Sequence, residues 1–258
     1  MPKGSTQTRL ENIAKEGASV DIQDMNYDDC VRLAAKEAAE TPRGVIVQDT
    51  AWDGYEEIPA WIMQGYGTMA MEAGEQLKAQ GCERPTHIFV QAGVGSLAGA
   101  VVGYFANLYA DNPPTFVVVE AEAAACLYKG AAAGDGKIRI VDGDMETIMA
   151  GLACGEPNTI SWDILKNHVK VFIAAPDWVA ANGMRMLAAP IKGDASITSG
   201  ESGAAPFGAL AAMTTLDEYE QLKKDIGLDE NSRVLLFSTE GDTDPDRYKN
   251  IVWKGLDK

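Results

Sequence analysis

Short apolar runs alternate along the chain with longer segments whose apolar residues recur every three or four positions. The short runs are rich in β-branched residues and predict buried strands, whereas the longer segments predict amphipathic helices. Strands are predicted over 18–23, 44–48, 86–91, 115–120, 138–141, 170–174 and 233–237. Helices are predicted over 6–16, 27–41, 61–80, 96–109, 145–153, 161–167, 177–187, 204–214 and 216–226. Strands separated by helices predict an α/β fold, with open, mainly parallel sheets flanked by helices.

The first predicted element is a helix, although an α/β unit usually opens with a strand. Two interpretations stay open: the chain begins inside a domain, or a short tail precedes a peripheral helix. The loop at 49–59 is the candidate domain boundary, because no low-complexity linker interrupts the chain elsewhere.

Composition narrows the class of partner. Hydrophobic residues make up 46% of the 258 residues, which is enough for a packed core. The formal net charge of −16 argues against nucleic acid or an anionic membrane as the main partner, and a small metabolite is expected instead.

The four cysteines form no C-x-x-C pair and there are only two histidines, so neither a disulfide scaffold nor a metal site is expected. With no apolar stretch of membrane-spanning length and no signal pattern, the expected location is cytoplasmic.

A glycine-rich turn between a predicted strand and a predicted helix is the clearest candidate for a ligand-binding site. It runs from Gln91 to Gly99, and its candidate ligand-binding residues are Gly93, Val94, Gly95, Ser96 and Leu97. Glycines permit a tight turn and a close backbone approach, while amides at a helix N-terminus and the helix dipole favour an anion. A phosphate is the simplest such anion.

Two phosphate-bearing ligands compete for this turn. Gly93, Gly95 and Ala98 satisfy the G-x-G-x-x-G/A pattern of a dinucleotide site, and Glu120 follows the next strand as the acid that would bind a ribose. A dinucleotide-dependent oxidoreductase therefore stays open. Against it, the turn comes late in the chain and no hydride-transfer constellation of histidine or lysine is apparent.

Five separated segments, in order, give a more specific match. The turn at Gly93 to Leu97 is similar to the phosphate loop of fold-type-II pyridoxal-phosphate enzymes. Other segments resemble the diaminopropionate ammonia-lyase family: residues 1–5 (MPKGS), 48–55 (QDTAWDGY), 148–157 (IMAGLACGEP), 199–204 (SGESGA) and 238–244 (STEGDTD).

This resemblance implies a tryptophan synthase β-like fold, pyridoxal 5′-phosphate as cofactor, an amino-acid substrate and a homodimer. It implies α,β-elimination of 2,3-diaminopropionate to pyruvate and ammonia, with the cofactor accepting the electrons. It carries a catalytic acid or base onto Asp49, and the hydroxyl that meets the pyridine nitrogen onto Ser238 or Thr239, without choosing between them. It divides the chain into 1–50, the remainder of a small domain, and 51–258, a large domain that binds the cofactor phosphate.

The chain departs from the family at one essential point, because the N-terminal lysine motif that holds the cofactor as a Schiff base is absent. The lysines present stand in polar or surface-helix contexts, with no apolar surround to lower a pKa for imine chemistry. The resemblance therefore implies a C-terminal portion of a longer enzyme, and we expect little or no lyase activity from this chain alone. The alternative is a non-catalytic module for cofactor binding or dimerisation.

Overall fold

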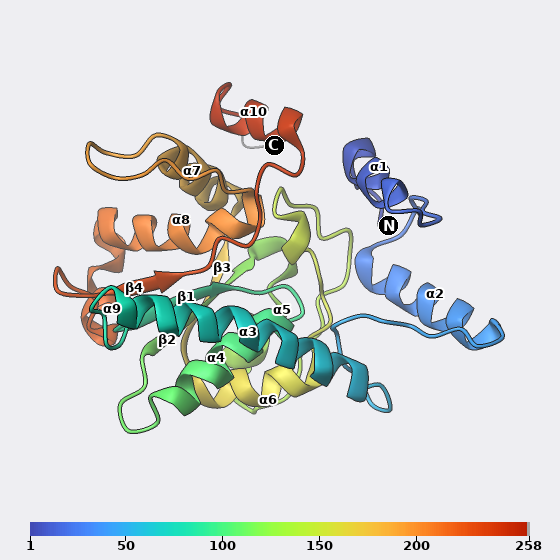
Figure 1. Cartoon of the computed structure of the whole chain (residues 1–258), viewed down its shortest axis with the longest axis horizontal. Helices are drawn as coiled ribbons and strands as arrows, with labels where there is room; N and C mark the ends of the chain where they lie inside the picture. Colours follow the sequence, from blue (N-terminus) through green and yellow to red (C-terminus); the bar gives the residue numbers. More distant parts are fainter. Residues whose placement is uncertain (257–258) are drawn as a thin grey trace.

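A parallel sheet of four strands forms the centre of the molecule, which was obtained as a computed structural model describing residues 1–256. Its strands are β1 (His87–Gln91), β2 (Thr115–Ala121), β3 (Val169–Ala175) and β4 (Val234–Leu236), in the order β3-β2-β1-β4 (Figure 1). The register places Val90 beside Val118, and Phe89 beside both Val117 and Leu236. The predicted α/β class and parallel pairing are confirmed.

Helices cover both faces of this sheet, which explains why the strands are apolar without alternation. The helices are α1 (Gln7–Lys15), α2 (Tyr27–Glu40), α3 (Glu57–Ala79), α4 (Ser96–Leu108), α5 (Cys126–Ala133), α6 (Thr159–His168), α7 (Asp177–Ala188), α8 (Glu201–Thr215), α9 (Glu220–Ile226) and α10 (Pro245–Val252). On one face, Phe89 and Val117 pack with residues of α7, α8 and α10. On the other, Ile88 and Val118 pack with residues of α3 to α6.

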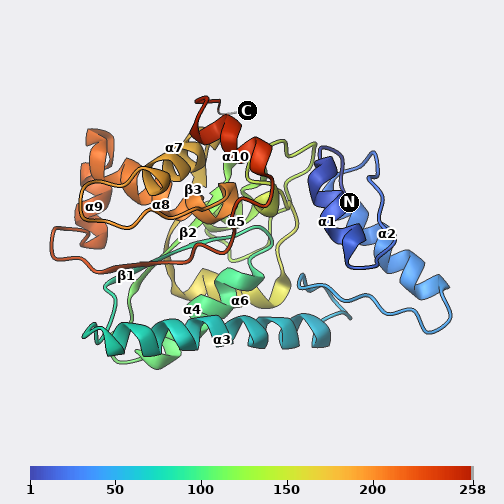
Figure 2. The same ribbon diagram turned by 45° about the horizontal axis from the view of Figure 1, so that its top comes forward.

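The first two helices stand beside this body rather than on the sheet, as Figures 1 and 2 both show. Helix α1 buries none of its residues and α2 buries only Asp28. Helix α1 begins where the Thr6 side chain accepts a hydrogen bond from the Arg9 amide. The separate position of α1 and α2 fits the predicted division near residue 50, which stays a prediction.

Three predicted strands are wrong, because each lacks a partner in the sheet. In 44–48, Val45 and Val47 are 68% and 70% exposed, and the Tyr55 hydroxyl bonds to the backbone of this segment in place of a neighbouring strand. In 138–141, the only backbone hydrogen bond to another segment joins Val141 to Gly155 within the described residues. In 18–23, backbone hydrogen bonds to other described segments are confined to Met1, which donates to the Asp21 carbonyl and accepts from the Gln23 amide.

The predicted helix over 145–153 is also wrong. Met145 has φ +47°, a left-handed conformation that cannot begin a right-handed helix. Only a single 3₁₀ turn forms, at Ala150–Leu152. The other predicted helices form with small shifts at their ends, and α5 and α10 were not predicted. Among residues 1–256, no helix has the length and apolar character that crossing a membrane requires.

Candidate ligand-binding site

A cavity of about 450 Å³ opens where strand β1 ends. Its wall brings together segments that are far apart in the sequence: Tyr27, Asp49, Tyr66, 91–97, 150–152, Cys154, Ser202, Thr239 and Glu240. The carboxyl end of a parallel sheet is where α/β folds usually bind ligands. The predicted glycine turn, Asp49 and one of the two candidate hydroxyls therefore line one cavity.

The glycine turn presents a helix N-terminus to this cavity. Gly95 is the N-cap of α4 at φ +99°, and no side chain caps the helix. The first amides of a helix have no partner within the helix, so those of Ser96 and Leu97 are available to a ligand. A Cβ on Gly93 would lie 3.1 Å from both the Cys154 Sγ and the Gly151 carbonyl oxygen, so glycine is required for the close packing here. These features suit a phosphate group.

Asp49 is tied to the glycine turn through its backbone. Its carbonyl oxygen accepts hydrogen bonds from Ser96 Oγ and Asn158 Nδ2, both at 2.7 Å. Its carboxylate oxygen Oδ2 accepts a hydrogen bond from the Tyr66 hydroxyl at 3.0 Å, which leaves Oδ1 for a ligand. Partial burial, with help from the adjacent carboxylate, raises the pKa of Tyr66 to about 12, so the phenol keeps its proton near neutral pH. An acid at the end of a buried strand was expected at Asp49, but a loop holds it instead.

Asn158 links segments around the cavity in a way that the sequence analysis missed. Its side chain is fully buried and accepts hydrogen bonds from the amides of Ile160 and Ser161, capping α6. The same side chain donates to the Asp49 carbonyl and, at 2.8 Å, to Ser96 Oγ. It therefore links α6, the glycine turn and Asp49. An Asn before a helical pattern is an N-cap signal, but that signal indicates nothing about the other two contacts.

The two candidate hydroxyls have different surroundings. Thr239 lines the cavity, and its Oγ1 lies 2.8 Å from Gln91 Nε2. Ser238 is not among the lining residues, and its hydroxyl donates to Ser199 Oγ at 2.8 Å. These contacts favour Thr239 as the hydroxyl that reaches a ligand.

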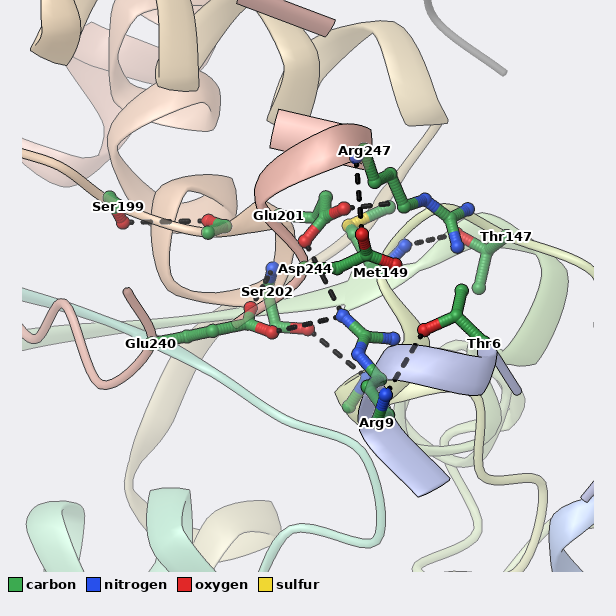
Figure 3. A network of polar contacts seen from close by, with 12 residues as sticks. Thr6, Arg9, Thr147, Met149, Ser199, Glu201, Ser202, Glu240, Asp244 and Arg247 are labelled. Atoms are coloured by element: carbon green, nitrogen blue, oxygen red, sulfur yellow. Dashed lines mark hydrogen bonds and ion pairs between the residues drawn. The ribbon is translucent and has the colours of Figure 1, made fainter. Parts of the chain in front are cut away.

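A cluster of ion pairs joins helix α1 to the rim of the cavity (Figure 3). Arg9 lies 3.6 Å from Glu201 Oε2 and 3.4 Å from Glu240 Oε1. Arg247 Nε approaches the second oxygen of Glu201 to 3.3 Å, as an ion pair without hydrogen-bond geometry. Burial raises the pKa of Glu201. Because Glu240 also accepts the Ser202 amide at 2.8 Å, the cluster connects three separate segments at the cavity wall.

Glu120 does not lie in this cavity. It is 1% exposed, and its two carboxylate oxygens accept the amides of Leu127 and Tyr128 at 2.8 and 2.6 Å. The side chain therefore stabilises the first turn of α5, and neither oxygen is free for a ribose. This removes the acidic residue on which the dinucleotide interpretation depended.

The pH dependence of unfolding tests this role of Glu120. Desolvation raises the pKa of Glu120 to about 8, despite the amides that bond to the carboxylate. The folded chain therefore keeps a proton between about pH 4.5 and 8 that the unfolded chain releases, so the free energy of unfolding falls as the pH rises through that window. Urea denaturation is expected to show this fall in the unaltered chain and a weaker dependence in Glu120→Gln. Glu122→Gln, which changes a neighbouring exposed side chain, is the control; equal slopes in both variants would contradict the assignment.

The lining residues fit a phosphorylated ligand that carries a further hydrogen-bonding group. Amides of the α4 N-terminus suit its phosphate, and the Thr239 hydroxyl at the cavity wall suits a second polar atom of the ligand. No lysine among residues 1–256 lines the cavity.

Comparisons with known proteins point to one family. A family model described as "Pyridoxal-phosphate dependent enzyme" matches residues 1–239. Diaminopropionate ammonia-lyase of Salmonella typhimurium is 54% identical over 256 residues, which are 99% of this chain and 63% of that protein. The crystal structure of the selenomethionine-containing holo diaminopropionate ammonia lyase from Escherichia coli superposes with a TM-score of 0.92 at 47% identity, covering 100% of this chain and 63% of that one. A second Escherichia coli structure, with an aminoacrylate–PLP azomethine intermediate, gives 0.92 at 46% identity over 100% of this chain and 64% of that chain. The chain thus spans about 63% of the length of the relatives it matches.

Proposed function

Since the chain belongs to the pyridoxal-phosphate-dependent enzyme family, we propose that it supplies the phosphate-binding and substrate-facing part of a 2,3-diaminopropionate ammonia-lyase. The main support for this proposal is that the glycine turn, Asp49 and Thr239 line the same cavity. The reaction would convert one diaminopropionate and one water into pyruvate and two ammonia molecules. Pyridoxal 5′-phosphate, when bound, supplies the electron sink that makes the proton on Cα acidic.

The glycine turn would hold the cofactor through its phosphate. Backbone amides at the start of α4 donate to an anion there without any movement of side chains, and the helix dipole adds to the attraction. Thr239, which also lines the cavity, would meet the ring nitrogen. Five residues, Gly93, Val94, Gly95, Ser96 and Leu97, would thus fix the phosphate end, and Thr239 the ring end.

Asp49 would act on the substrate. Tyr66 holds Oδ2 of the carboxylate, so Oδ1 is the oxygen that accepts a proton or pairs with the β-ammonium group. The two hydrogen bonds to its backbone carbonyl fix the residue relative to the phosphate loop, which is the kind of positioning that acid–base catalysis requires.

Turnover would need a lysine that holds the cofactor as a Schiff base. None of the lysines among residues 1–256 lines the cavity, so we propose that the chain by itself binds the cofactor without a Schiff base and releases no pyruvate at enzymatic rates. A non-catalytic cofactor-binding module, the second candidate, is favoured by the same observation.

A stable conjugate of cofactor and substrate tests the proposal without turnover. The chain is expected to bind N-(5′-phosphopyridoxyl)-2,3-diaminopropionate more tightly than the matching alanine conjugate, because Asp49 can pair with the β-ammonium. In Asp49→Asn this preference is expected to fall by about 10- to 100-fold, the loss of one charge-assisted hydrogen bond. Isothermal titration calorimetry measures both affinities. Asp53→Asn, an exposed aspartate of the same loop, is the control, and an unchanged preference in Asp49→Asn would contradict the assigned role.

We further propose a homodimer and a cytoplasmic location. Large apolar side chains that stay exposed support association, among them Trp61 at 58% and Trp253 at 82%. The four cysteines are all free, which suits a reducing compartment. Sedimentation velocity measures the proposed dimer.

A further inference from the structure

Glu240 brings a second carboxylate to the wall of the cavity. Among residues 1–256, the charged side chains that line the cavity are those of Asp49 and Glu240, and no lysine, arginine or histidine joins them. The chain as a whole carries a formal net charge of −16. A phosphorylated ligand is an anion, so the carboxylate of Glu240 would repel it unless a nearby cation neutralises the charge.

Close packing keeps this carboxylate in place. Glu240 Oε2 accepts a hydrogen bond from the Ser202 amide at 2.8 Å, and the Glu240 carbonyl oxygen accepts one from the Gly200 amide, also at 2.8 Å. A Cβ on Gly200 would lie 2.6 Å from Glu240 Cγ, so the two loops are in direct contact. The charge of Glu240 is therefore fixed at the cavity wall, next to Thr239.

Arg9 of helix α1 supplies the opposite charge. Its Nη2 lies 3.4 Å from Glu240 Oε1 and 3.6 Å from Glu201 Oε2 (Figure 3). The side chains of Arg9 and Glu240 are 16% and 17% exposed, so solvent screens their attraction less than that of a surface pair. Arg247 pairs with Glu201, and no cation other than Arg9 pairs with Glu240 in the part of the chain that the structure describes. Neutralisation of Glu240 therefore depends on Arg9.

The position of Arg9 within α1 is unfavourable for the helix itself. Arg9 lies in the first turn, where the positive end of the helix dipole repels a cation, and no acidic residue accompanies it there. Helix α1 buries none of its residues, so apolar packing does not account for its place beside the cavity. Among the described residues, the ion pairs of Arg9 are the polar contacts that join α1 to the cavity wall.

We propose that Arg9 is a positioning residue of the cofactor site, which neutralises Glu240 so that the cavity accepts a phosphate anion. The inference rests on the proposed binding of pyridoxal 5′-phosphate and extends it to a residue of α1 that does not itself line the cavity. Without Arg9, the carboxylate of Glu240 would be uncompensated at the wall, and its field would oppose an anion throughout the cavity.

Removing the charge of Arg9 tests the proposal with two ligands. The 258-residue chain and Arg9→Gln are titrated with pyridoxal 5′-phosphate and with unphosphorylated pyridoxal, and fluorescence measures the affinities. Arg9→Gln is expected to weaken binding of the phosphorylated compound about tenfold, the effect of one uncompensated charge near a dianion, and binding of pyridoxal less than about threefold. Arg9→Lys keeps the charge and is expected to bind the phosphorylated compound within about threefold of the unaltered chain.

Arg32→Gln is the matched control. Arg32 lies on α2 and forms an ion pair with Glu156, so this pair also joins an N-terminal helix to the rest of the chain. Neither residue lines the cavity, and the Arg32 side chain is 55% exposed. Arg32→Gln is therefore expected to leave the affinity for both ligands unchanged.

A change at Glu240 shows whether Arg9 acts through this carboxylate. Arg9→Gln is made again in a Glu240→Gln background, where an amide oxygen can still accept from the Ser202 amide but position 240 carries no charge. Here Arg9→Gln is expected to change the affinity for pyridoxal 5′-phosphate by less than about threefold. If Arg9 only held α1 in place, its loss would have the same effect in both backgrounds.

The outcomes separate this inference from the proposed function. If the unaltered chain binds pyridoxal 5′-phosphate no more tightly than pyridoxal, the proposed phosphate site fails, and the inference fails with it. If the unaltered chain prefers the phosphorylated compound but Arg9→Gln keeps the full preference, only the inference about Arg9 is wrong. Equal weakening by Arg9→Gln in the two backgrounds would also overturn it.

Discussion

Gly95→Ala is expected to bind pyridoxal 5′-phosphate at least about 100-fold more weakly than the unaltered chain, a loss of about 2.7 kcal/mol. Gly95 has φ +99°, a conformation that costs a residue with a Cβ on the order of 1–2 kcal/mol. An added Cβ would also lie 2.9 Å from Ser161 Oγ and 3.2 Å from Leu165 Cδ1. The turn must therefore move, and its amides then no longer converge on the phosphate. Hydrogen bonds to a charged group contribute about 1.5–3 kcal/mol each, so losing two of them accounts for the expected effect.

Gly134→Ala is the matched control for this change. Gly134 also has a positive φ, +68°, but an added Cβ there would meet nothing within 4 Å, and the residue does not line the cavity. Both variants are expected to lose stability in urea denaturation, whereas only Gly95→Ala loses affinity in a fluorescence titration with the cofactor. Equal affinities for the cofactor in the two variants would show that the turn does not hold the phosphate.

Asn158→Ala is expected to lower the free energy of unfolding by about 2–4 kcal/mol and to weaken cofactor binding about tenfold. Loss of the α6 cap accounts for about 1 kcal/mol. The rest comes from buried polar groups that each lose one of their hydrogen bonds, since the Asp49 carbonyl and Ser96 Oγ both accept from this amide. Without that link, Asp49 is held to the glycine turn only through the Ser96 hydroxyl. Urea denaturation and a cofactor titration measure the two effects.

Two further variants separate the roles of Asn158. Asn158→Asp keeps an oxygen to cap α6 but lacks the amide donors, so it is expected to lose cofactor affinity as Asn158→Ala does. Asn167→Ala removes an exposed asparagine near the end of the same helix and is expected to change neither property by much. If Asn158→Ala retains full affinity, the link between Asp49 and the turn does not support binding.

The sheet and the geometry of the glycine turn were predictable because their signals are local. Strands β1 and β2 are continuous apolar runs buried on both faces, and the turn follows directly from Gly93 and Gly95 between a strand and a helix. The same local signal gave a wrong strand prediction at 44–48. Three consecutive apolar residues there have no neighbouring strand in the described structure, and the Tyr55 hydroxyl bonds to their backbone instead. Strand propensity describes a segment, whereas a strand also needs a partner.

The polar contacts around the cavity could not be predicted in this way, because they join residues that are distant in sequence. Asn158 and Asp49 are separated by 109 positions, and Gln91 and Thr239 by 148. A single asparagine or glutamine carries no pattern that identifies its partner. The family resemblance placed the candidate hydroxyl at Ser238 or Thr239, and the structure distinguishes the two by their hydrogen bonds and by which of them lines the cavity.

The affinity of the 258-residue chain for pyridoxal 5′-phosphate, compared with that for unphosphorylated pyridoxal, tests the account most directly. Each sample is treated with borohydride after the titration and analysed by mass spectrometry. We expect the phosphorylated compound to bind at least about 100-fold more tightly, through charge-assisted bonds at the turn, and without a reduced lysine adduct. Equal affinity for the two compounds would contradict phosphate recognition by residues 93–97, and a stoichiometric adduct on one lysine would contradict binding without a Schiff base.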